Sequence, residues 1–72
     1  MKYIVISELY PILFPSAMSH DSFYQGWNIT SAGFVNITDG VPHCFGESTM
    51  LKIKSNPELD EMLIRILLRL ED

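Results

Sequence analysis

Cys44, with His43 beside it, is the residue of this chain best suited to covalent chemistry, and His20 and Asp21 lie further upstream. A thiol, an imidazole and a carboxylate could act together as nucleophile, base and orienting group. His20, His43 and Cys44 could instead ligate a metal ion. Neither arrangement has the local spacing, such as paired Cys-x-x-Cys or His-Glu-x-x-His, that makes these patterns specific.

The strand that the sequence predicts over residues 41–45 argues against both kinds of chemistry. His43 and Cys44 would point to opposite faces of that strand, so they could not share one ion. A lone cysteine in a strand is usually a small buried hydrophobic residue. We therefore predict that the protein is not an enzyme and carries no cofactor. A ligand- or metal-binding domain using His20, His43 and Cys44 is the alternative.

The glycines are scattered and form none of the spaced glycine motifs that bind phosphate groups. Gly33 lies inside a predicted strand, where a glycine marks a bulge or a close approach of another backbone segment. We therefore expect a structural role for Gly33, either in a bulge or in close backbone packing.

The charge balance excludes some classes of partner. Five Lys and Arg residues against nine Asp and Glu residues give the 72-residue chain a formal charge of −4. Non-specific nucleic-acid binding and attraction to anionic membranes both need clusters of basic residues, so we expect neither. A single cysteine excludes an internal disulfide bond.

Residues 1–19 superficially resemble a signal peptide, but Ser7, Glu8 and two prolines interrupt the apolar run. A secretory segment needs ~7–15 uninterrupted apolar residues, and a membrane span needs ~20. Asn28-Ile29-Thr30 and Asn36-Ile37-Thr38 match the glycosylation sequon, which matters only in a secreted protein. We predict a cytoplasmic protein that does not contact a membrane.

Hydrophobic patterning predicts a single α+β domain over residues 1–72, with a small, mostly antiparallel sheet of about four strands and one C-terminal helix packed across it. The first strand is apolar on both faces and should be central. The segment 9–14 contains Pro11 and should be an edge strand or a loop. The predicted strands are 2–7, 30–38, 41–45 and 48–54, and the predicted helix is 57–70.

The predicted helix has more apolar surface than one small core needs. Its 3.6-residue period assigns one face to the sheet, made of Leu59, Met62, Leu63, Ile66, Leu67 and Leu70. Ile64 and Leu68 lie four residues apart on nearly the opposite face. They are either ordinary exposed aliphatic residues or part of an interface formed by self-association.

Three short motifs occur along the chain: Ser31-Ala32-Gly33-Phe34-Val35, then Cys44-Phe45-Gly46-Glu47-Ser48, then Ser55-Asn56-Pro57-Glu58-Leu59-Asp60 followed by Leu63-Ile64. They resemble a pattern in short uncharacterised open reading frames of bacteria and their phages, which reads SAGF, C-x-G-x-S and S-x-P-x-x-D. Leu9-Tyr10-Pro11 and Phe14-Pro15 are also similar, so the resemblance covers most of the chain. It implies a prophage-type or accessory origin and brings no known activity or functional residue.

The most direct functional hypothesis is a small cytoplasmic protein-interaction module of phage or accessory type, which self-associates through its C-terminal helix. Ile64 and Leu68 would form the contact, with Tyr24 and Trp27 folding over the core or over a partner. The partner would be another protein, either a second copy in a homodimer or a different chain.

Overall fold

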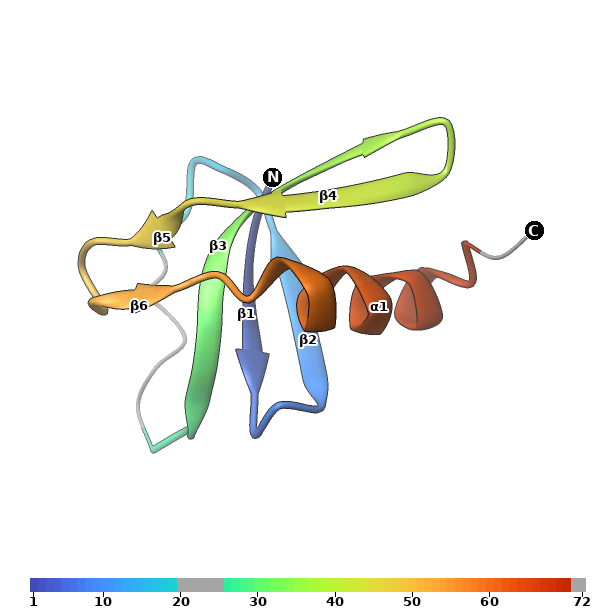
Figure 1. The fold of residues 1–72 in the computed structure, drawn as a ribbon. Helices are drawn as coiled ribbons and strands as arrows, with labels where there is room; N and C mark the ends of the chain where they lie inside the picture. Colours follow the sequence, from blue (N-terminus) through green and yellow to red (C-terminus); the bar gives the residue numbers. More distant parts are fainter. Residues whose placement is uncertain (20–25, 71–72) are drawn as a thin grey trace.

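The computed structural model of the protein describes residues 1–19 and 26–70. Its main feature is a four-stranded antiparallel sheet in the order β2-β1-β3-β4, with one helix across it (Figure 1). The α+β prediction is confirmed. The elements are β1 (Lys2–Ile6), β2 (Tyr10–Phe14), β3 (Ile29–Thr38), β4 (Val41–Phe45), β5 (Glu47–Ser48), β6 (Ile53–Lys54) and α1 (Pro57–Leu68).

Strand β1 occupies the centre of the sheet, as its two apolar faces predicted. It pairs with β2 on one side and β3 on the other, both antiparallel. Tyr3, Ile4 and Val5 are all fully buried. Because consecutive side chains of a strand point to opposite faces, Tyr3 and Val5 lie on one face and Ile4 lies on the other.

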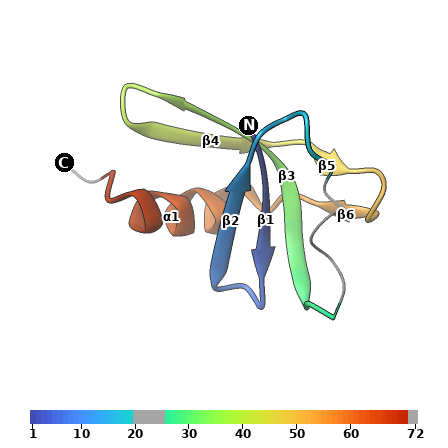
Figure 2. The same cartoon turned by 180° about the vertical axis from the view of Figure 1, so that it is seen from behind.

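The sheet therefore has an apolar layer on each face. Helix α1 covers one layer, and Figure 2 shows the sheet from the other side, with α1 behind it. The first layer consists of Tyr3, Val5, Val35, Cys44, Leu63 and Ile64, with Leu13 and Leu59 packed against it. The second consists of Ile4, Phe14 and Ala32, against which Ile6, Ile12, Ile29, Leu51 and Ile53 pack.

Strand β2 forms one edge of the sheet, as Pro11 predicted. Pro11 pairs with Val5, whose carbonyl oxygen faces β3 and accepts a hydrogen bond from Thr30 Oγ1 at 3.3 Å. The backbone groups of Pro11 therefore face outward, where the missing N–H costs no ladder hydrogen bond.

Strand β4 forms the other edge, and neither of its outward-facing backbone positions has a free N–H donor. Asp39 and Gly40 both have positive φ and make a two-residue turn between Thr38 and Val41. In this register the backbone N–H and C=O positions of Pro42 and Cys44 face away from β3, although both side chains are buried. Pro42 has no donor, and the Cys44 N–H donates to Glu61 Oε2 at 2.8 Å.

The predicted strand 48–54 is instead two short strands, β5 and β6, joined by a turn. Lys52 has a left-handed φ of 57°, which no regular strand contains. The turn brings Leu51 and Ile53 onto the second apolar layer. The packing of these two side chains accounts for the turn, which the weak polar–apolar alternation of the sequence did not indicate.

Helix α1 begins at the predicted position and ends two residues earlier than predicted. Asn56 is the N-cap and Pro57 is the first helical residue, and the Asn56 side chain itself makes no capping hydrogen bond. Arg69 ends the helix in the left-handed conformation, and its N–H donates to the carbonyl oxygen of Ile66. No helix in the described parts of the chain is long and apolar enough to cross a membrane.

The predicted close packing at Gly33 is confirmed. A Cβ atom at this position would lie 2.6 Å from the carbonyl oxygen of Phe45 and 3.2 Å from Ser55 Cβ. The chain leaving β4 and the chain entering α1 both cross this point. Gly33 therefore lets the helix approach the sheet.

We expect Gly33→Ala to destabilise the fold by about 1–3 kcal/mol, because the new methyl group must displace backbone atoms and not a flexible side chain. Urea denaturation measures the change. Asn36→Ala, at an exposed position of the same strand, is the control and should change stability little. A Gly33→Ala protein as stable as the wild type would contradict the close approach.

Candidate functional site

Asp60 is a fully buried carboxylate at the contact between α1 and the sheet. The hydroxyl of Tyr3 and the backbone N–H of Asn56 (2.8 Å) both donate to Oδ2, and the hydroxyl of Ser31 donates to Oδ1 at 2.7 Å. Its place in the first helical turn also favours negative charge. No buried side-chain oxygen or nitrogen in the described parts of the chain lacks a partner.

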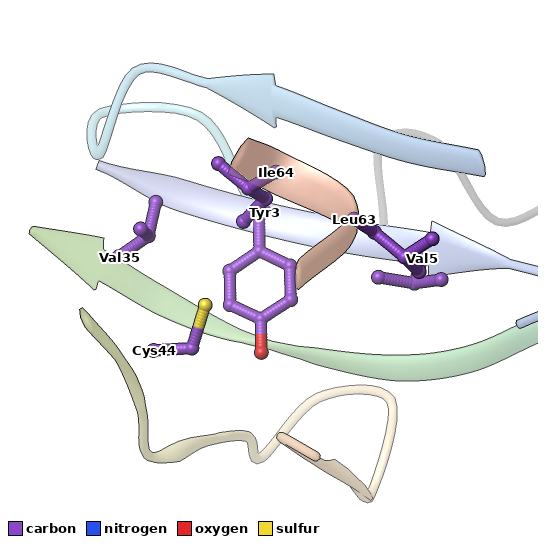
Figure 3. Close-up of a cluster of buried hydrophobic side chains, with 6 residues drawn as sticks. All are labelled: Tyr3, Val5, Val35, Cys44, Leu63 and Ile64. Carbon is purple, nitrogen blue, oxygen red and sulfur yellow. The ribbon is translucent and has the colours of Figure 1, made fainter. Parts of the chain in front are cut away.

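This carboxylate sets the rotation of α1. With Asp60 facing the sheet, the residues three and four positions later face it too, and Leu63 and Ile64 are accordingly buried. The prediction that Ile64 lies on an exposed second face is therefore wrong, because its side chain is 0% exposed. Ile64 packs with Tyr3 and Cys44 in the first apolar layer (Figure 3).

The same rotation moves residues that were predicted to pack on the sheet into solvent. Ile66 is 67% exposed, and Met62 and Leu67 are each 49% exposed. The predicted sheet-facing set is therefore wrong for these three residues, whereas Leu63 is buried and Leu59 and Leu70 are partly buried. The burial of Asp60 against the sheet explains the difference, because it fixes which side of the helix faces inward.

The side of α1 that faces away from the sheet carries two exposed apolar residues, Met62 and Ile66, which we call the outward stripe. They lie four residues apart and so follow one another on the helix surface. Leu59 is next to them on the helix but packs partly against the core. Three exposed charged residues border the stripe: Glu58, Arg65 and Arg69.

The other predicted interaction residues do not join this stripe. Leu68 is 40% exposed, but it follows Glu61 and Ile64 at helical spacing, on the side of α1 that faces β4. Trp27 is 46% exposed and precedes β3. Tyr24 lies outside the described residues.

Of the residues considered for metal or covalent chemistry, the structure describes His43 and Cys44, and these point to opposite faces of β4. His43 is exposed and Cys44 is buried, as expected for neighbours on opposite faces of a strand. His20 and Asp21 lie outside the described residues. Within residues 1–19 and 26–70, no group of three His, Cys, Asp or Glu side chains could hold a metal ion.

The Cys44 thiol lies beside the ring of Tyr3 in the apolar layer (Figure 3). Burial raises the pKa of this thiol to about 12; the charges of Asp60 and Glu61 also raise it, and hydrogen bonding with Tyr3 partly opposes them. Burial, and then the hydrogen bond to Asp60, raise the pKa of the Tyr3 hydroxyl. Both groups are therefore held in the neutral form and are poorly suited to nucleophilic chemistry.

Comparison with protein-family models, curated proteins and solved structures finds no match to this chain.

We expect Asp60→Ala to destabilise the protein by about 3–5 kcal/mol, because it leaves the buried hydroxyls of Tyr3 and Ser31 and the partly buried N–H of Asn56 without their acceptor. A single small domain has only about 5–15 kcal/mol of stability, so a large fraction should unfold. Tyr3→Phe should cost about 1–3 kcal/mol, and less in the Asp60→Ala background, since the two groups share one interaction. Denaturation of the double-mutant cycle measures this; strictly additive losses would contradict the shared network.

We expect Cys44 to react slowly with thiol reagents at pH 8 in the folded protein and rapidly after denaturation. A thiol whose pKa is raised from 9.0 to about 12 stabilises the fold fully below pH 9. That contribution is lost as the pH rises toward 12, because the unfolded state releases the proton first. Cys44→Ala should reduce this loss of stability at alkaline pH. Fast alkylation of the native protein would contradict the expected low reactivity of the thiol.

Proposed function

We propose that this protein is a small interaction module that self-associates through the outward stripe of α1. The observation that carries the proposal is the pair Met62 and Ile66, which lie one helical turn apart and are 49% and 67% exposed. Single exposed aliphatic residues are ordinary on protein surfaces. Two adjacent ones with charged residues along one side have the composition of an interface with an apolar centre next to a polar rim.

The energetics favour covering this stripe. Full burial of one large aliphatic side chain contributes about 1.5–3 kcal/mol, and a two-fold dimer buries that side chain in both copies, so the contribution occurs twice. The domain's own core cannot provide that burial, because the hydrogen bonds of Asp60 hold the opposite side of α1 against the sheet. A second copy presents the same stripe and is therefore a partner of matching chemistry.

The strand edges support α1 over strand addition as the route to a partner. A partner strand needs outward N–H and C=O groups along an edge. Pro11 and Pro42 each remove one such donor, and Glu61 occupies that of Cys44. We place this role in the cytoplasm, since the chain has a single cysteine and so depends on no internal disulfide.

We expect the wild-type protein to form dimers at ~10–100 μM, a range in which a dimer of ordinary affinity is populated. The double substitution Met62→Lys with Ile66→Lys should leave a folded monomer, since neither side chain belongs to the core. Sedimentation or light scattering measures the mass, and circular dichroism verifies the fold.

Leu9→Lys is the matched control, because Leu9 is similarly exposed but lies in the β1–β2 turn. It should remain dimeric. A wild-type protein that stays monomeric throughout this concentration range would overturn the proposed function.

A further inference from the structure

Resting on this proposed function, we infer that the two copies pair their α1 helices antiparallel, with Glu58 of each copy facing Arg65 and Arg69 of the partner copy. The exposed charges of the helix divide by sign along its length. Glu58 lies in the first turn, whereas Arg65 lies in the last turn and Arg69 is the C-cap. Positions 58, 62, 65 and 69 share one side of a helix, so these charges border the outward stripe.

The other acidic residues of α1, Asp60 and Glu61, already accept hydrogen bonds within the molecule. Asp60 is buried against Tyr3 and Ser31, and Glu61 accepts a hydrogen bond from the backbone of Cys44. Glu58 is therefore the acid of α1 that is available to a partner on the outward side. The outward border is acidic at the start of the helix and basic at its end.

Symmetry turns this division into an orientation. A two-fold dimer uses the same surface on both copies, so each contact occurs twice. Antiparallel helices place the acidic start of one beside the basic end of the other, at both ends of the interface. Parallel helices would place Glu58 beside Glu58 and Arg69 beside Arg69. Antiparallel pairing also aligns the helix dipoles favourably.

The backbone at Arg69 adds a separate argument. Its φ of 56° and ψ of 44° lie in the left-handed region, where glycine is the usual residue at the end of a helix. An arginine there costs stability in the single copy. A role for its charge in the dimer gives that cost a reason.

A charge-exchange experiment tests the orientation. Glu58→Arg alone should weaken self-association roughly tenfold at low salt, because like charges then meet at both ends. The triple variant with Glu58→Arg, Arg65→Glu and Arg69→Glu should dimerise again. It should not form mixed dimers with the wild-type protein, because antiparallel mixing opposes like charges. Parallel helices would instead favour mixed dimers, and native mass spectrometry of a one-to-one mixture distinguishes the two.

Arg69→Gly gives a second readout that a purely structural role would not produce. It should keep or raise the urea midpoint of the monomer while weakening self-association, and the weakening should shrink in 0.5 M NaCl. Loss of dimerisation in the Met62 and Ile66 double variant, together with no effect of any charge variant, would overturn the antiparallel pairing and leave the proposed function intact. Mixed dimers between the triple variant and the wild type would also overturn it.

Discussion

The buried carboxylate of Asp60 is the interaction on which the arrangement of the molecule depends. It joins the first turn of the helix to β1 through Tyr3 and to β3 through Ser31, and it also binds the backbone of Asn56. An apolar contact alone would tolerate more than one rotation of α1, since aliphatic residues occupy more than half of the helix positions. Three hydrogen-bond donors that converge on one carboxylate can all be satisfied at only one rotation of the helix. Which apolar residues become core and which become surface follows from that choice.

Much of the sheet could be predicted from local sequence, because local rules govern it. The two apolar faces of β1 placed it at the centre, Pro11 placed β2 at an edge, and Asp39-Gly40 fixed the hairpin of β3 and β4. The rotation of α1 could not be predicted in this way. In the sequence, Asp60 cannot be told apart from any acidic residue that begins a helix. Its partners Tyr3 and Ser31 lie 57 and 29 residues away. The only local hint is that Ile64 fits one helical face with Asp60.

The candidate interface shows the same limit. Periodicity identified the helix as carrying surplus apolar surface, and the structure confirms that surplus, but on Met62 and Ile66 and not on Ile64. Edge protection also depends on non-local contacts. The missing donor of Pro42 can be predicted from the sequence. The hydrogen bond from the Cys44 N–H to Glu61 cannot, because it forms only where α1 and β4 lie side by side. Which side chains remain on the surface is therefore determined by the contacts that the core makes.

The distance in sequence between Tyr3 and Asp60 also has a consequence for how the chain folds during synthesis. The strands emerge from the ribosome before the helix does, and until residues 57–68 follow, the layer containing Tyr3, Val5 and Val35 has no cover. Contacts of such long range form late and slowly. Folding therefore waits for the last element, and in that interval the uncovered sheet is the species most exposed to chaperones and to aggregation.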